Sequence, residues 1–396
     1  MNFLILSLIK AAVLAGVLMT TLAYLQWIER KVIGHIQLRM GPYRVGPHGL
    51  LQPLADVVKL ITKEGVLPSH VNKLFYLLAP FLAVALALIS IAVIPFGPQV
   101  TIGPVTTWMQ LTDLNMGVLF VLAVSSVGVY AVALGGWASN NKYSLLGGLR
   151  SSAQMISYEL PLALALAAPL LLANTLSFRA IVDGQAGYWL GFIPRWNVFP
   201  EIVGFAVFVI AAFAETNRVP FDLPEAENEL VAGFHTEYSS MSFAAFFMAE
   251  YANMVTVTAV ATLLFLGGWH APFPEPYSSF IPIVIFAGGG LIALYHGLHP
   301  ARRKDKFTLP AAAVVFLGIA GIFGLSFYIP VMQTILMALF WFCGKVGFLL
   351  FVFIWVRGTL PRFRYDQLMR FAWIVLFPLS MVNLLVTGLI VALTSK

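Results

Sequence analysis

The stretch FLILSLIKAAVLAGVLMTTLAYLQWI, residues 3–28, decides the class of fold. It contains one charged side chain, Lys10. A helix needs about 20 mainly apolar residues to cross a bilayer, so this stretch predicts a membrane-spanning helix. No basic segment precedes a short apolar core here, and we therefore interpret the stretch as a retained span and not as a cleaved signal peptide.

The composition of the whole chain agrees with this reading. Of its 396 residues, 60% are apolar and 10% are charged, whereas an average soluble domain has about 25% charged residues. So few charges cannot cover a water-exposed surface, which excludes an ordinary soluble enzyme. The single cysteine, Cys343, excludes an internal disulfide and an iron–sulfur cluster held by four thiolates of this chain.

Ten apolar runs of spanning length follow one another along the sequence. They predict an all-α, polytopic membrane helix bundle that forms one integral membrane domain over residues 1–396. The expected spans are 3–28, 74–96, 114–137, 154–174, 199–216, 241–268, 279–298, 309–329, 333–356 and 371–393.

Basic residues set the expected orientation, because short cytoplasmic loops are enriched in Lys and Arg. The odd-numbered loops between the ten runs hold 18 of the 23 Lys and Arg residues. We therefore expect these loops to be cytoplasmic and both chain ends to lie on the far side of the membrane. The basic isoelectric point is then a consequence of topology and predicts no binding of nucleic acid.

The first loop contains an expected amphipathic helix at residues 50–64. Its apolar residues follow helical spacing on one side, while Asp56, Lys59 and Lys63 share the other. Fifteen residues are too few to span, so this helix should lie in the membrane interface, either as an anchor or as the wall of a substrate gateway. The preceding turn, residues 41–47, could present Arg39 and Arg44 to carboxylates of a partner or to lipid phosphates.

Three glutamates are expected at membrane depth, where a carboxylate is costly and usually functional. Glu159 follows a capping-box pattern at Ser151–Gln154 that predicts the start of the fourth span. Glu215 ends the fifth span, and Glu250 lies ten residues into the sixth, with Asn253 on the same helical face. Lys345 is a candidate counter-charge within the ninth span, although a lysine reaching toward the interface is an alternative.

Carboxylates also crowd the fifth loop, which has Arg218 as its one base. Like charges this close resist simultaneous ionisation, so such acids can take up and release protons near neutrality. A solvated acidic loop is the alternative. The acids of this loop are Asp222, Glu225, Glu227, Glu229 and Glu237.

Several long motifs resemble one known family. They are residues 27–31 (WIERK), 39–56 (RMGPYRVGPHGLLQPLAD), 140–144 (NNKYS), 156–161 (ISYELP), 214–229 (AETNRVPFDLPEAENE), 249–253 (AEYAN) and 360–369 (LPRFRYDQLM). In this order they resemble the membrane subunit called H in bacteria, and 1 in mitochondria, of the proton-translocating NADH:quinone oxidoreductase, respiratory complex I. The match runs through nearly the whole chain.

The resemblance implies a subunit of a translocase in the bacterial inner membrane that binds no metal or redox cofactor itself. NADH, FMN and iron–sulfur clusters would belong to partner subunits of the peripheral arm, and small membrane subunits and lipids would be further neighbours. Ubiquinone or menaquinone would be the substrate. Residues implied at the quinone chamber and docking face are Arg30, Arg39, Arg44, Asp56, Phe247, Tyr251, Arg357, Arg362 and Arg364. Those implied in proton coupling are Glu159, Glu215, Asp222, Glu225, Glu227, Glu229, Glu250 and Lys345.

One part of the chain departs from the family pattern. The family usually has eight spans, so residues 1–270 and 333–396 would be its core and 271–332 an inserted helical hairpin. Two other functions remain alternatives at this point. One is the equivalent subunit of a membrane-bound hydrogenase-type complex, and the other is a stand-alone ion-coupled transporter, for which the chain lacks the expected internal symmetry.

Overall fold

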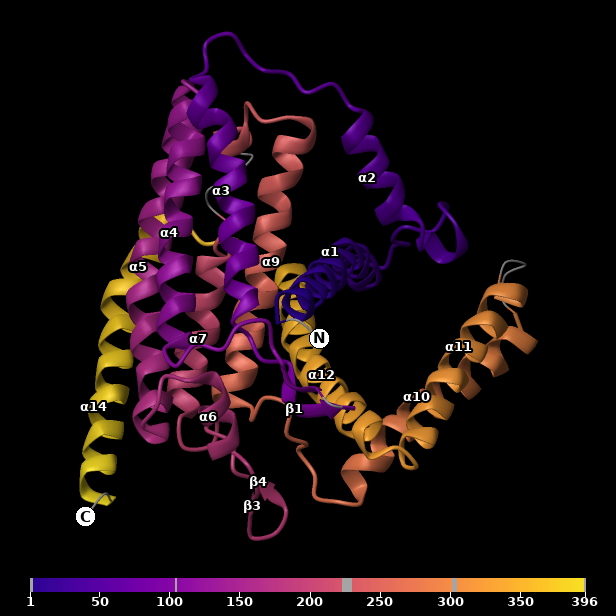
Figure 1. Cartoon of the computed structure of the whole chain (residues 1–396). Helices are drawn as coiled ribbons and strands as arrows, with labels where there is room; N and C mark the ends of the chain where they lie inside the picture. The colour runs from indigo at the N-terminus through magenta and orange to yellow at the C-terminus, as the bar shows by residue number, and fades with distance from the viewer. Residues whose placement is uncertain (1–2, 104, 223–229, 301–304, 395–396) are drawn as a thin grey trace.

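The computed structural model describes residues 3–103, 105–222, 230–300 and 305–394. Within these ranges, nine helical runs are long and apolar enough to cross a membrane (Figure 1). The all-α, polytopic prediction is confirmed. The runs are α1 (Phe3–Ile36), α3 (Lys73–Ala92), α4 (Gly117–Ala138), α5 (Lys142–Ala173), α9 (Ser240–Phe265), α10 (Tyr277–Leu298), α11 (Asp305–Ser326), α12 (Pro330–Thr359) and a last run of α13 (Tyr365–Arg370), η3 (Phe371–Leu376) and α14 (Phe377–Thr394).

The fifth predicted span, 199–216, is shorter than expected. Helix α7 covers Ile202–Glu215, which is 14 residues or about 21 Å, and this is less than the roughly 30 Å of a hydrocarbon core. The chain leaves the helix at Thr216, and Asn217 adopts a left-handed φ of 50°. Glu215 therefore ends a half-helix inside the bundle.

The fourth span starts earlier than its predicted capping box. Helix α5 begins at Lys142, where the Asn141 side chain accepts a hydrogen bond from the Tyr143 N–H at 3.0 Å. Ser151 is buried in the helix interior, so the predicted start at Ser151–Gln154 was wrong. The additional turns of α5 pack closely against α4 because glycines lie at the contact. A Cβ on Gly136 would lie 2.6 Å from the Ser144 carbonyl oxygen, too close for any side chain.

The predicted interfacial helix is present as α2 (Gln52–Thr62) and follows the short turn η1 (Pro47–Gly49). It runs from beside the end of α1 to the start of α9 (Figure 1), where the Ser240 hydroxyl lies 2.8 Å from the Leu60 carbonyl oxygen and 2.9 Å from that of Lys63. Apolar side chains such as Leu54 and Ile61 remain 63% and 62% exposed. This exposure is what a helix lying in a membrane interface requires, because lipid would cover its apolar face.

Two small hairpins and a short helix cap the other end of the bundle. Strands β1 (Gly97–Ile102) and β2 (Val105–Met109) pair antiparallel, as do β3 (Tyr188–Trp189) and β4 (Ile193–Pro194), and α6 (Phe178–Gly184) lies between the hairpins in sequence. Lys10 fixes the first hairpin, because its ammonium donates to the carbonyl oxygens of Trp108 (2.8 Å) and Gln110 (3.1 Å). We call this end the far side, and the end with α2 the basic side.

The main core lies where α5, α7 and α9 meet. Tyr158, Phe208 and Leu263 are almost completely buried there and come from these three helices. Helices α10 and α11 pack mainly on each other and stand to one side of the bundle (Figure 1).

Candidate functional site

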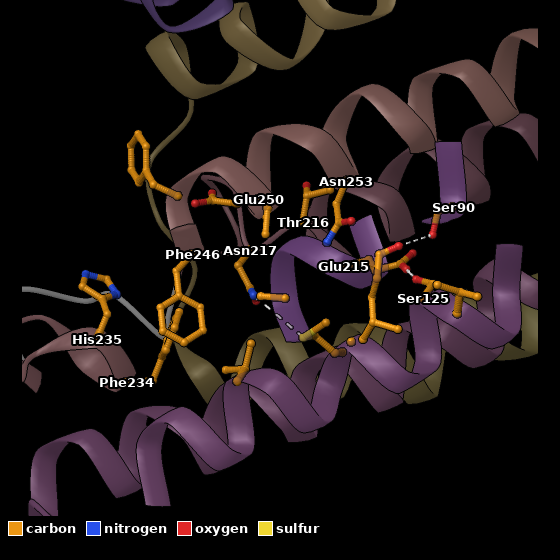
Figure 2. A pocket seen from close by; sticks show the side chains of 18 of the residues that line it. Ser90, Ser125, Glu215, Thr216, Asn217, Phe234, His235, Phe246, Glu250 and Asn253 are labelled. Carbon is orange, nitrogen blue, oxygen red and sulfur yellow. Dashed lines mark hydrogen bonds between the residues drawn. The ribbon is translucent and has the colours of Figure 1, made fainter. Parts of the chain in front are cut away.

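A cavity lies inside the bundle among α3, α4, α7 and α9 (Figure 2). It has a volume of about 770 Å³, its open mouth included. Glu250 and Asn253 both line it, so the prediction that they share one face of the sixth span is confirmed. Aromatic side chains form much of the remaining wall: Phe234, Phe243, Phe246 and Phe247.

His235 lies at the basic-side end of this cavity, in the turn η2 (Gly233–His235). Its ring contacts Phe234 edge-on at 5.0 Å and Phe243 at 5.2 Å. Burial lowers the pKa of His235 to about 4, because a charged imidazolium would lose its hydration there. The ring is therefore neutral at physiological pH.

Glu215 joins this cavity to a second one. The second cavity, of about 470 Å³ with its opening included, is lined mainly by apolar residues and shares Ser90, Ser125, Glu215 and Asn253 with the first. The Ser125 hydroxyl donates a hydrogen bond to the Glu215 carboxylate (Figure 2). A buried carboxylate needs such a donor when it is ionised, and the same hydroxyl can accept a hydrogen bond from the carboxyl group when that group is protonated.

Glu159 has a parallel arrangement on the neighbouring helix. The hydroxyl of Ser126 donates to the Glu159 carboxylate, so two glutamates from α5 and α7 bind consecutive serines of α4. Sequence reasoning identified both glutamates and missed the serines. The signal was present, since Ser125 and Ser126 interrupt an otherwise apolar run.

A buried network of charges lies next to Glu250. The Arg218 guanidinium contacts the carboxylates of Glu29 (3.2 Å) and Glu250 (2.9 Å), and it lies 4.2 Å from the Tyr251 ring centre. The Tyr251 hydroxyl donates to Glu29 at 2.6 Å, and Arg357 forms an ion pair with the same carboxylate. Glu29 and Arg218 are 3% and 4% exposed.

This network connects four parts of the chain: α1, the segment after α7, α9 and α12. Its two carboxylates and two guanidiniums balance in charge, which makes their burial possible. Neither Glu29 nor Arg218 is among the predicted site residues. In the sequence, Glu29 appears only as part of a motif and Arg218 only as a base in a loop. Their pairing could not be foreseen, because Arg218 is 189 residues from Glu29 and 32 residues from Glu250.

The segment that follows α7 is fixed by α5 and by the C-terminal region. The Gln154 amide donates to the carbonyl oxygens of Ala214 and Phe221, both at 2.8 Å. Arg362 contacts Asp222 at 2.9 Å, which brings together two of the predicted residues. Glu225, Glu227 and Glu229 lie outside the residues that the structure describes.

Most of the predicted arginines are exposed, including Arg30, Arg39, Arg44 and Arg364. Arg30 contacts Asp56 at 2.9 Å and thereby ties α1 to α2. Arg39, Arg44 and Arg364 point to the basic-side surface, and all three are exposed. These three arginines can meet a partner, and Arg364 also contacts its exposed neighbour Asp366 at 3.6 Å. Arg30 and Asp56 hold the interfacial helix in place.

Lys345 lies at the far side, away from these acids along the bundle. Its ammonium donates to the backbone carbonyls of Leu266 (2.6 Å), Gly268 (2.9 Å) and His270 (2.6 Å). The Trp196 ring lies 4.2 Å from the same ammonium. In the part of the chain that the structure describes, Lys345 forms no ion pair with a carboxylate and instead caps the end of α9. That same part holds no group of three or more His, Cys, Asp and Glu side chains placed to bind a metal.

Known proteins resemble this chain along nearly its whole length. The family model described as NADH dehydrogenase matches residues 9–388. The chain is 68% identical to the NADH-quinone oxidoreductase H subunit 1 of Solibacter usitatus, over all of this chain and 99% of that protein. It is 50% identical to the H subunit 2 of Koribacter versatilis (99% and 98% covered) and 45% identical to the H subunit 2 of Geobacter metallireducens (99% and 97%).

These matches cover nearly the whole of this chain and of its relatives, including the regions that build the cavity and the charge network. The chain therefore belongs to the H-subunit family of NADH-quinone oxidoreductase and is a multi-pass membrane subunit of complex I.

Proposed function

We propose that this subunit forms the membrane part of a quinone-reduction chamber and couples reduction to proton translocation through its buried carboxylates. One observation carries the proposal. Glu215 joins the two cavities, and Glu250 links the larger one to the buried network of Arg218 and Glu29. The relatives are named NADH-quinone oxidoreductases, which favours a quinone over the substrate of a hydrogenase-type complex.

The chemistry of quinone reduction makes such acids useful. A quinone accepts two electrons and two protons to become a quinol, and we propose that electrons come from partner subunits. Removing protons or adding negative charge near the cavity changes which carboxylates are ionised. Each pKa unit of change corresponds to about 1.36 kcal/mol, so a few interacting acids can store part of the energy released.

The contacts of Glu250 and Glu215 suggest how the effect would travel. Glu250 shares Arg218 with Glu29, so protonating either carboxylate strengthens the hold of Arg218 on the other. Glu215 and Glu159 are joined to adjacent serines, which can donate or accept as the carboxylates change charge. We propose that Asp222, Glu225, Glu227 and Glu229 extend this acidic path along the fifth loop.

The surroundings of the cavity suggest the chamber's boundaries. We propose that α1, α2 and α9 frame the membrane entrance, with Arg30 and Asp56 fixing α2, and Phe247 and Tyr251 on the wall. The exposed Arg39, Arg44 and Arg364, together with Arg362, would meet peripheral-arm subunits on the basic side. We propose that this side is the cytoplasmic face of a bacterial inner membrane.

The decisive experiment is Glu215→Gln in the assembled complex reconstituted in proteoliposomes. NADH:quinone reductase rate and proton translocation are measured together, the latter with a pH-sensitive dye. We expect the number of protons moved per electron pair to fall well below that of the unmodified complex, because Gln cannot ionise.

Glu201→Gln is the matched control. Glu201 is a buried acid next to the other end of α7, hydrogen-bonded to Asn383 (2.7 Å) and Thr387 (2.5 Å), and it lines neither cavity. It should leave the proton-to-electron ratio unchanged. An unchanged ratio in Glu215→Gln would overturn the role proposed for this residue.

A further inference from the structure

The helical hairpin α10–α11 has no role in the function proposed above. It is attached to the bundle mainly at its far-side half, where Phe286 and Phe323 contact Phe340 of α12 at ring-centre distances of 6.0 and 5.8 Å. From there the hairpin diverges from α12 toward the basic side (Figure 1).

In the part of the hairpin that the structure describes, the basic-side end contacts a distant segment through polar side chains. The His48 imidazole Nε2 lies 2.9 Å from the Thr308 hydroxyl and 3.3 Å from the Asp305 carboxylate, both in the first turn of α11. The two segments are 260 residues apart in sequence. The Asp305 side chain is 14% exposed, so this contact is shielded from solvent on most sides.

His48 belongs to a tight turn, residues 41–51, that leads directly into α2. Gly46, His48 and Gly49 all have positive φ, of 71°, 49° and 79°. A Cβ on Gly49 would lie 2.3 Å from the Pro42 carbonyl oxygen, so the turn closes on itself. A histidine in the left-handed region is uncommon, and a specific contact of its side chain helps to stabilise it there.

The same turn packs on the end of α1. A Cβ on Gly41 would lie 2.8 Å from the Arg30 carbonyl oxygen, and the Tyr43 ring lies 5.5 Å from the Lys31 ammonium and 5.3 Å from the His48 ring. The turn is thus held between α1 on one side and the hairpin on the other, and α2 starts one residue beyond it.

We propose that the α10–α11 hairpin is a brace for α2, with His48, Asp305 and Thr308 as positioning residues. The hairpin reaches across from α12 and fixes the turn from outside, while Arg30 and Asp56 fix α2 from α1. The brace also sets the width of the quinone entrance beside α2, a role that rests on the function proposed above.

The test uses the whole complex with His48→Asn on one side of the contact and Thr308→Ala on the other. Asparagine tolerates a positive φ, so His48→Asn keeps the turn's backbone while its shorter side chain cannot reach α11. Hydrogen–deuterium exchange of the amides of residues 44–55 reports the brace itself. We expect exchange to rise about fivefold in each variant, which corresponds to about 1 kcal/mol for one hydrogen bond, and to rise no further in the double variant.

Two comparisons make the result specific. Thr308→Ser keeps the hydroxyl and should restore slow exchange, and His296→Ala, an exposed histidine at the same end of α10, should change nothing. Unchanged exchange in both His48→Asn and Thr308→Ala would overturn the brace.

A separate measurement, of KM and kcat for quinone, tests whether the brace affects the quinone entrance. We expect KM for a long-chain quinone to change in His48→Asn and Thr308→Ala, with kcat and the KM for a short-chain analogue unchanged. Faster exchange with unaltered KM values would overturn the role at the entrance. The Glu215→Gln experiment does not involve α2, so its outcome tests the proposed function independently.

Discussion

Replacing Arg218 with methionine tests the charge network directly. Arg218 is 4% exposed and lies within 3.2 Å of two carboxylates. After the change, Glu29 keeps the Arg357 ion pair and the Tyr251 hydroxyl at 2.6 Å, whereas Glu250 loses its 2.9 Å contact. The change therefore breaks one ion pair of a half-buried carboxylate, since the Glu250 side chain is 17% exposed. We expect a loss of about 3 kcal/mol, the lower end of the range for breaking a buried ion pair.

The double variant Arg218→Met with Glu250→Gln separates charge from packing. It restores the balance of one carboxylate and one guanidinium, so we expect it to recover most of the lost stability. The assay is the half-life of NADH:quinone reductase activity at raised temperature, with the amount of assembled complex as a second readout. Lys59→Met is the surface control, since Lys59 is 67% exposed and 3.7 Å from Asp56, and should cost less than about 1 kcal/mol. A single variant as stable as the unmodified complex, or a double variant no better than the single one, would refute this reasoning.

Three further outcomes follow from the structure. Gly49→Ala should loosen the turn before α2, because Gly49 has a φ of 79° and an added Cβ would lie 2.3 Å from the Pro42 carbonyl oxygen. Limited proteolysis should detect the change. Gly65→Ala is the control, since there is open space around Gly65. Lys345→Met should reduce the amount of assembled complex, because it removes three hydrogen bonds to backbone carbonyls. Normal assembly together with a loss of proton translocation would instead support the predicted role of Lys345 as a counter-charge. Burial lowers the pKa of His235 from 6.5 to about 4. The neutral ring should therefore stabilise the fold fully above pH 6.5, and this stabilisation should be lost as the pH falls toward 4. The rate of thermal inactivation should depend less on pH over that interval in a His235→Gln variant than in the unmodified complex.

Length and boundaries of the helices could be predicted only where apolar residues alone set them. The bounds of α3 and α4 agree with the predicted spans to within a few residues. Helix α1 starts where it was predicted but continues past residue 28 to Ile36, because the charged end of a helix has no apolar signal. The start of α5 was missed, because the capping-box pattern at Ser151–Gln154 predicts a helix start there. In the structure Gly147 and Gly148 are already helical and lie in close contact with η2 and α4. The end of α7 was found, yet its shortness was not, because apolar residues precede Ile202 without forming helix.

The site shows the same division. Glu215 and Glu250 were recognisable from the sequence, because burying a carboxylate in a membrane costs free energy and such residues are usually functional. Glu29 and Arg218 lie at the ends of apolar segments, where charges are ordinary, so nothing in the local sequence distinguishes them. Only the packing of α1 against α9 and α12 buries them together.

The sequence by itself determined that this protein is a bundle of membrane helices and to which family it belongs, and its distribution of bases predicts which way the loops face. Those properties depend on composition and local order along the chain. The tertiary structure decided that Glu215 joins two cavities, that Arg218 bridges Glu29 and Glu250, and that His48 meets the first turn of α11. Each of these contacts joins residues far apart in sequence, and their chemistry depends on burial and distance, which exist only once the helices have packed.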